Sequence, residues 1–341
     1  MQHSIGERTL LFAHAPQVVS SASVVSRAEG DGPLGKSFDV VLADDKLGED
    51  RFEKAECRMF EQSVRLTCSK AGLQPKDLDL LVAGDLLNQI ITANYGARTF
   101  GVPYLGLYGA CSTMAESLLV ASVLLDGGYR KRAACAACSH FSTAERQYRF
   151  PLEMGTTAPP TAQRTVTGAG CLLLAAEDVP LPVFTHVFVS AATIGKVVDL
   201  GINDANNMGA AMAPACCDTL LAHLEDTGSA PSDFDLIVSG DLGKFGAEML
   251  FSLCAQHGVD LSGRHIDCGD RMYHPDQNYN CGGSGAGCSA VTLAGYLLPM
   301  LEHGDCSRIL FLATGALMSP TSGLQGETIP AIAHAIVFER R

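Results

Sequence analysis

The stretch DLDLLVAGDLL, residues 77–87, decides the fold because a close copy of it occurs later in the chain. The copy, DFDLIVSGDLG, covers residues 233–243, and each version is an acidic turn followed by an apolar strand that ends in Gly-Asp. The aspartates in question are Asp85 and Asp241. Self-similarity over so long a distance indicates a duplicated architecture.

A second repeat surrounds two cysteines. Residues 109–128, GACSTMAESLLVASVLLDGG, resemble residues 285–305, GAGCSAVTLAGYLLPMLEHGD. Each begins with Gly-Ala, reaches Cys-Ser, and continues with helical periodicity until glycine ends it. Apolar strands follow both copies and close both halves, which predicts an α/β protein with mainly parallel sheets. The expected halves are residues 1–180 and 181–341.

Each half carries an extra segment. The first half has residues 140–164, which read as a loop because they contain proline and glycine, and the second has an insert at about 259–282. Long loops in compact α/β chains commonly form lids, binding loops or interfaces.

The composition limits the function classes. The 341 residues are 47% hydrophobic and carry a net charge of −13, so a large core is expected and broad nucleic-acid binding is not. We expect no signal peptide and no membrane-spanning segment, since no apolar run is long enough. The 13 scattered cysteines indicate reduced thiols. The pair Cys135 and Cys138 is interpreted as two small residues of a buried strand, with a redox or metal role as the alternative.

The sequence places Cys111 at the start of the first repeated helix. Thr113 and Glu116 fit a capping box, and Met114, Leu118, Ala121 and Leu125 share one face. Free N–H groups at a helix start stabilise a thiolate and also bind carboxylates. The residues therefore allow either a nucleophile or an anion-binding site.

These features carry a resemblance to known proteins. The glycine loop GGSGAGCSA (282–290) and the final strand IAHAIVFER (332–340) resemble those of the thiolase and ketoacyl-synthase superfamily, which implies a thiolase-like five-layer α-β-α-β-α sandwich. Longer strings resemble the stage V sporulation protein AD family more closely: AGDLLNQIITANYGAR (83–98), LYGACSTMAES (107–117), SHFSTAERQYRFP (139–151), IGKVVDLGINDANNMGAAMAPA (194–215) and YHPDQNYNCGGSGAGCSAV (273–291).

The resemblance implies a function. The family is expected to bind dipicolinic acid and, with the other proteins of the same sporulation operon, to assist the uptake of that acid or its calcium chelate into the developing spore. It also implies a peripheral position at the spore inner membrane and a homodimer. We expect no cofactor and no protein metal site, with Ca²⁺ present only as part of the chelate.

The chain departs from catalytic members of the superfamily. Those enzymes carry a histidine and an asparagine, or two histidines, on loops of the second half. Here Ser284 stands where the asparagine would be, and His274-Pro275 has an altered context. We therefore expect a binding protein rather than an enzyme. The alternatives are an acyltransferase or condensing enzyme that uses Cys111, and a scaffold for membrane transport proteins.

The candidate ligand-binding residues follow from this interpretation. Arginines and amides suit carboxylates, methionine suits a ring, and aspartates suit Ca²⁺. The set is Cys111, Asp85, Asn88, Asn94, Arg98, His140, Arg146, Arg149, Asp199, Met208 and Ser284.

Overall fold

The computed structural model describes residues 4–148, 158–180 and 185–341. Its main sheet runs in the order β12-β11-β14-β15-β10-β3-β9-β7-β5-β6. The first half supplies β3 (Gln17–Val25), β5 (Leu80–Gly84), β6 (Tyr104–Gly106), β7 (Arg132–Ser139) and β9 (Gly168–Ala175). The second supplies β10 (Val187–Thr193), β11 (Leu236–Ser239), β12 (His265–Asp267), β14 (Arg308–Ala316) and β15 (Ala331–Arg340).

The strand order confirms the duplication, but the prediction of mainly parallel sheets is wrong, because each half combines antiparallel and parallel pairs. In the first half, β3-β9-β7 is antiparallel and β7-β5-β6 is parallel; in the second, β10-β15-β14 is antiparallel and β14-β11-β12 is parallel. The halves meet where Phe188 of β10 pairs with Gln17 of β3. The exact boundary at residue 180 stays a prediction. Short strands β1 (Ser4–Ile5), β2 (Thr9–Leu11) and β4 (Val40–Val41) extend the margins.

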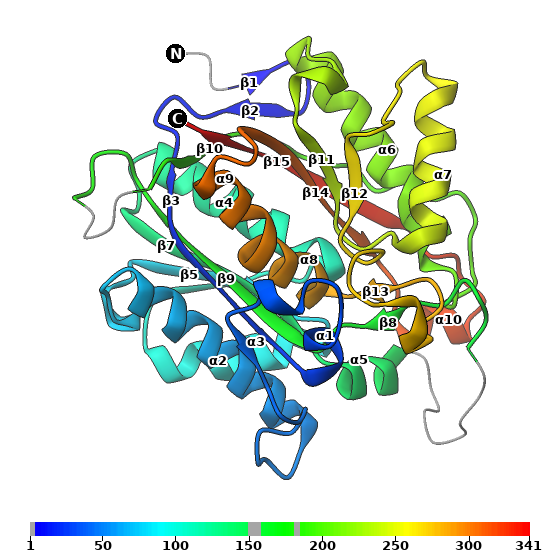
Figure 1. The fold of residues 1–341 in the computed structure, drawn as a ribbon, viewed down its shortest axis with the longest axis horizontal. Coiled ribbons are helices and arrows are strands. Elements are labelled where there is room, and N and C mark those ends of the chain that lie inside the picture. Colours follow the sequence, from blue (N-terminus) through cyan, green and yellow to red (C-terminus); the bar gives the residue numbers. More distant parts are fainter. Residues whose placement is uncertain (1–3, 149–157, 181–184) are drawn as a thin grey trace.

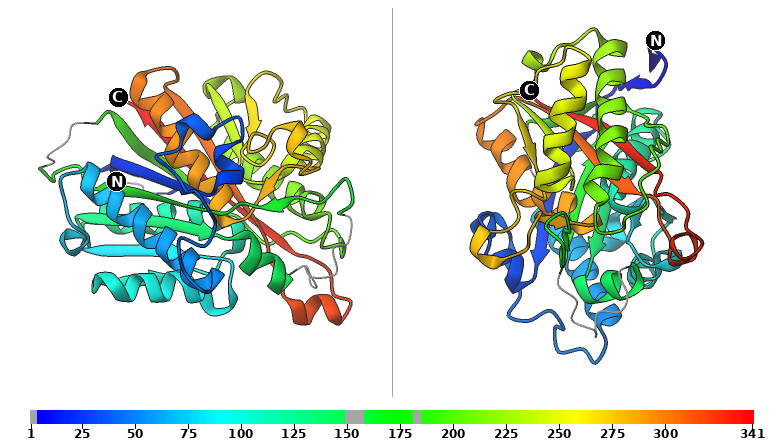
Figure 2. Two further views of the ribbon diagram at one scale, coloured as in Figure 1. Left: turned by 60° about the horizontal axis from the view of Figure 1, so that its bottom comes forward. Right: turned by 90° about the vertical axis from the view of Figure 1, so that its right-hand side faces the viewer.

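Helices lie between and outside the two half-sheets, so the predicted five-layer sandwich is confirmed (Figure 1). Helices α2 (Phe52–Lys70) and α3 (Ile91–Phe100) cover the first half-sheet. Helices α6 (Met208–Thr227) and α7 (Gly243–Gln256) cover the second. Helix α4 (Thr113–Asp126) and the run α8 (Ala286–Thr292), a π-helical turn (Leu293–Leu297) and α9 (Leu298–His303) fill the middle, as Figure 2 shows from two sides.

The middle layer explains the small residues of the sequence. On α4, Met114 and Leu118 are fully buried, and each contributes about 2 kcal/mol by leaving water. Strand β7, RAACAACS, faces helices on both sides, and its Cys135 and Cys138 are fully buried, which confirms the interpretation of this pair as strand residues.

Two predicted loops contain regular structure. The segment after β7 forms helix α5 (Phe141–Tyr148), since its Thr143, Ala144 and Glu145 turn inward. The insert at 259–282 contains β12 and a short 3-10 turn (Pro275–Gln277). Short helices α1 (Arg27–Gly30) and α10 (Pro320–Leu324) complete the fold. Among the described residues, no helix combines the length and apolarity needed to cross a membrane.

Candidate functional site

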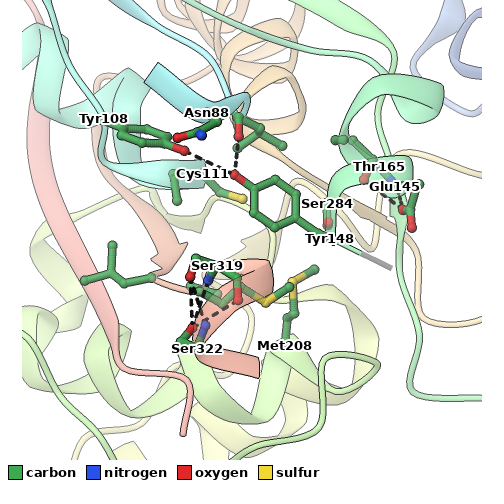
Figure 3. Close-up of a pocket in the computed structure, with 16 residues that line it drawn as sticks. Asn88, Tyr108, Cys111, Glu145, Tyr148, Thr165, Met208, Ser284, Ser319 and Ser322 are labelled. Atoms are coloured by element: carbon green, nitrogen blue, oxygen red, sulfur yellow. Dashed lines mark hydrogen bonds between the residues drawn. The ribbon is translucent and has the colours of Figure 1, made fainter. Parts of the chain in front are cut away.

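A cavity of about 450 Å³ opens where the two halves meet, beside the start of α4 (Figure 3). Apolar, aromatic and hydroxyl side chains make up most of its wall. The described wall consists of Leu86, Asn88, Tyr108, Ala110, Cys111, Ala144, Glu145, Tyr148, Thr165, Met208, Ser284, Ala316, Leu317, Met318, Ser319 and Ser322. Its size is typical of a small-molecule site.

The cavity contains Cys111 because of a tight turn before α4. Ala110 has φ 52°, in the left-handed region that costs a residue with a β-carbon about 1 kcal/mol or more. Thr113 donates to the Ala110 carbonyl at 2.7 Å, and Ser112 donates to the Gly109 carbonyl at 2.6 Å. The predicted capping box of Thr113 and Glu116 is therefore wrong, because the threonine hydroxyl turns back into the turn.

Asp241, from the second repeated Gly-Asp, lies behind Cys111. Its carboxyl group accepts hydrogen bonds from the Gly285 N–H at 2.9 Å, from the Thr314 hydroxyl at 2.7 Å, and from the Cys111 thiol. Burial raises the pKa of Asp241 from 3.8 to about 7, although these donors oppose the rise. The partner of the cysteine is thus a hydrogen-bond acceptor that can bind a proton near neutral pH.

The equivalent residue of the first half has a different task. Asp85 is fully buried, and its oxygens accept from the N–H groups of Leu87 at 2.7 Å and Ala93 at 2.8 Å. It therefore holds the start of α3, and burial raises its pKa to about 6. Asp85 does not line the cavity, but it fixes the turn that brings Leu86 and Asn88 there.

A two-stranded sheet joins the halves at the cavity. Strand β8 (Arg164–Thr165) pairs with β13 (Gly283–Ser284), which places Thr165 beside Ser284. Glu145 of α5 accepts from the Thr165 hydroxyl at 2.8 Å and from its N–H at 3.2 Å. The next residue, Gly285, has φ +105°, and a β-carbon there would lie 2.8 Å from the Ser139 hydroxyl.

Two tyrosines form another part of the wall. Tyr148 of α5 donates to the Leu86 carbonyl, and its hydroxyl lies 3.4 Å from that of Tyr108. Burial raises the pKa of Tyr148, so its hydroxyl remains protonated. Figure 3 shows this tyrosine near Cys111 and Asn88, with Ser319, Ser322 and Met208 on another part of the wall.

The structure brings four predicted residues together: Cys111, Asn88, Met208 and Ser284 line the cavity. Arg149 lies outside the described residues. The remaining candidates do not line the cavity and have other partners. Asp85 holds the start of α3, Asn94 donates to the Gln89 carbonyl, and Asp199 accepts from Thr328 and Gly201. His140 hydrogen-bonds to the Asp45 carbonyl, Arg98 lies over the Tyr95 ring, and Arg146 lies over the Phe52 ring.

No described histidine, lysine or arginine lines this cavity. His265 bonds to Ser239, His334 accepts from the Gly195 N–H, and burial lowers the pKa of both to about 4. His274 is exposed in its loop. Among the described residues, no cluster of three or more His, Cys, Asp or Glu side chains is arranged to hold a metal ion.

The sequence prediction missed several residues of the site. Tyr148 and Glu145 of the wall belong to the segment 140–164, whose proline and glycine indicate a loop; helical periodicity is the signal that could have identified them. Asp241, behind the wall, is the copy of Asp85, so the repeat itself could have identified it. The wall residues Leu317 and Met318 connect the end of β14 at Ala316 to Ser319, which is the N-cap of α10, so they belong to no strand or helix that a periodic pattern would predict.

Comparison of the fold with solved structures supports a thiolase-like architecture. The chain is 14% identical to 3-oxoacyl-[acyl-carrier-protein] synthase III from Aquifex aeolicus VF5, with a TM-score of 0.59 over 95% of this chain and 99% of that one. Against human mitochondrial 3-ketoacyl-CoA thiolase in complex with CoA, the identity is 12% and the TM-score 0.59, over 97% and 99%. At these identities the likeness concerns the fold alone.

Sequence comparison is more specific. Residues 6–339 match the family model for stage V sporulation protein AD. The chain is 43% identical over 335 residues to stage V sporulation protein AD of Bacillus subtilis (strain 168), covering 98% of this chain and 97% of that protein. This protein therefore belongs to the stage V sporulation protein AD family.

Proposed function

We propose that the cavity beside Cys111 binds dipicolinic acid, or its calcium chelate, and that the protein assists the uptake of this compound into the developing spore without catalysing a reaction. The observation that carries the proposal is the cavity itself. It is a pocket of about 450 Å³ with apolar surfaces for a ring and scattered hydroxyl and amide groups for carboxylates.

The wall offers suitable contacts for a flat aromatic ring and its carboxylates. Met208 and Met318 are polarizable side chains that pack well against aromatic rings. The hydroxyl groups of Ser284, Ser319 and Ser322 can donate to carboxylate oxygens. The start of α4 adds backbone N–H groups next to Cys111.

The surroundings of Cys111 argue against nucleophilic catalysis. The thiolate of a cysteine nucleophile is usually favoured by a histidine or another cationic partner. No described histidine, lysine or arginine lines this cavity; the thiol donates to Asp241 instead, and the ionised form of Asp241 disfavours a second negative charge beside it. We therefore assign Cys111 to the floor of a binding site.

The remaining parts of the proposal concern partners. We propose that the protein docks, as a peripheral protein, on other proteins of its operon at the spore inner membrane. We also propose a homodimer formed along β6, which pairs only with β5 in the described sheet. Leu105 and Tyr108, in and beside this edge strand, are 42% and 50% exposed, which suits an interface.

Calorimetry with purified protein tests the binding proposal. Dipicolinate, with and without Ca²⁺, should give saturable one-site binding. Met208→Trp, which fills the cavity, should lower affinity at least tenfold, whereas Met249→Trp should leave it unchanged because Met249 of α7 does not line the cavity. Absence of saturable binding with either form would refute the proposal.

The two alternatives have their own readouts. Incubation with a panel of acyl-CoA thioesters should leave the intact mass unchanged, and an increase that Cys111→Ser abolishes would favour acyl transfer. For the scaffold alternative, spores that carry Met208→Trp are decisive. We expect them to accumulate less dipicolinic acid, and normal accumulation despite lost binding would favour a scaffold.

A further inference from the structure

Asp241 occupies an unusual position for a buried carboxyl group. It is fully buried, and its donors come from three separate parts of the fold: Cys111 before α4, Gly285 before α8, and Thr314 on β14. Its main-chain carbonyl accepts from the Gln163 side chain at 2.7 Å, which fixes the backbone. The carboxyl group therefore has one defined place, immediately behind the cavity floor.

The fold does not need this carboxylate for the task that its copy performs. In the first half, Asp85 holds the start of α3. In the second half, Asp267 of β12 takes over, and it accepts from the N–H groups of Leu242 at 2.8 Å and Gly243 at 2.9 Å, where α7 begins. Asp241 therefore does not cap α7, and its carboxyl group accepts a hydrogen bond from Cys111 instead.

The surroundings of Asp241 are poor in positive charge. Among the described residues, no lysine, arginine or histidine forms an ion pair with it. Five titratable groups interact with Asp241 electrostatically or by a hydrogen bond: Cys111 before α4, Asp267 of β12, Cys268 after β12, Cys288 of α8 and Cys216 of α6. All are neutral or negative, so a further negative charge nearby has no cation to offset it.

We propose that Asp241 makes ligand capture proton-linked: the dicarboxylate binds with uptake of one proton by Asp241, whereas its charge-balanced calcium chelate binds without one. The inference rests on the proposed function, since it concerns the same cavity. It assigns to Asp241 a role in choosing between two forms of one ligand.

The physical reason is repulsion between like charges. Asp241 accepts a hydrogen bond from Cys111 of the cavity floor, and Ser284 of the wall directly precedes Gly285, which donates to Asp241. A ligand carboxylate bound on this floor therefore lies close to the Asp241 carboxylate, in a medium of low polarity. Two carboxylates that share such a site do not both stay ionised, and the protein carboxyl group takes a proton. In the chelate, Ca²⁺ neutralises the charge of both ligand carboxylates, so Asp241 does not need to take up a proton.

Glu145 provides an internal comparison. It also lies in the wall, but its oxygen accepts from both the N–H and the hydroxyl of Thr165, on the side of α5 rather than beneath Cys111. The variants Asp241→Asn and Glu145→Gln therefore test the two carboxyl groups separately.

The experiment is calorimetry of dipicolinate and of calcium dipicolinate in HEPES and Tris buffers, whose ionisation enthalpies differ, between pH 6 and 9. The wild type should take up close to one proton per dipicolinate at pH 8 and none with the chelate. Its affinity for dipicolinate should fall about tenfold per pH unit above pH 7, while affinity for the chelate stays level. Asp241→Asn should abolish both the uptake and the pH dependence, and Glu145→Gln should retain them.

Thr314→Val supplies a variant that keeps the carboxyl group. Removing this donor should move the break in the pH profile upward, since the carboxylate loses a hydrogen bond. Binding of dipicolinate by the wild type without proton uptake, or uptake that persists in Asp241→Asn or vanishes in Glu145→Gln, would overturn the inference and leave the proposed function standing. No binding of either form at any pH would overturn the proposed function and this inference with it.

Discussion

The pH dependence of unfolding should change when Asp241 is replaced by asparagine. Burial raises the pKa of this carboxyl group from 3.8 to about 7. The native state therefore holds a proton that the unfolded state releases, so the stability of the wild type should fall as the pH rises from about 4 to about 7. Above that range the whole cost of the buried carboxylate is present. Asparagine has no charge and should remove this contribution.

The size of the effect follows from the shift. A rise of roughly three pKa units corresponds to about 4 kcal/mol once the group is fully ionised. Between pH 5 and pH 8, linkage assigns about 2 to 3 kcal/mol of lost stability to Asp241 alone. Asp85, whose pKa is raised to about 6, contributes a slope of the same sign that persists in the variant. The slope should therefore become shallower but not vanish.

Urea unfolding of both proteins at pH 5, 6, 7 and 8 measures this difference. The free energy of unfolding of Asp241→Asn, relative to the wild type, should rise by about 2 to 3 kcal/mol over that range. Asp199→Asn is the control: hydrogen bonds lower the pKa of Asp199, so its carboxylate contributes a constant amount of stability above about pH 5, and the profile of this variant should run parallel to that of the wild type from pH 5 to pH 8. Parallel profiles for the wild type and Asp241→Asn would refute the assignment of a raised pKa to Asp241.

Three further outcomes are expected. Iodoacetamide should alkylate Cys111 several-fold faster in Asp241→Asn at pH 8, because a neighbouring carboxylate disfavours the thiolate; equal rates, read by peptide mass spectrometry, would contradict this. Diamide should join Cys217 and Cys254, whose sulfur atoms lie 3.6 Å apart, with a mass loss of two hydrogens that Cys254→Ser prevents. Asp85→Ala should lower the free energy of unfolding by about 2 kcal/mol or more, since two buried N–H groups at α3 lose their acceptor; a change below about 0.5 kcal/mol in urea unfolding would count against it.

Much of the fold could be predicted from the sequence, because the duplication shows the pattern of the main strands and helices twice. The strands before Asp85 and Asp241, and the helices that begin near Cys111 and Cys288, occur where the repeats place them. The site was harder to predict, because its wall comes from segments that are far apart in the chain. Exposed residues such as Arg98 looked suitable by chemistry alone, yet Arg98 stacks on a ring outside the cavity.

The same duplication explains how a symmetric scaffold produces an asymmetric site. In both halves Gly-Asp lies at the end of a parallel strand, so Asp85 and Asp241 occupy equivalent positions in the fold. Because Asp267 caps α7, the second aspartate can turn toward the first half's cysteine, and the first cannot. The thiol then donates to a buried carboxyl group, and no described histidine lines the cavity beside it. A carboxyl group with a pKa near neutrality in that place can change its protonation in response to the charge of a bound ligand, which is the behaviour that we propose for Asp241.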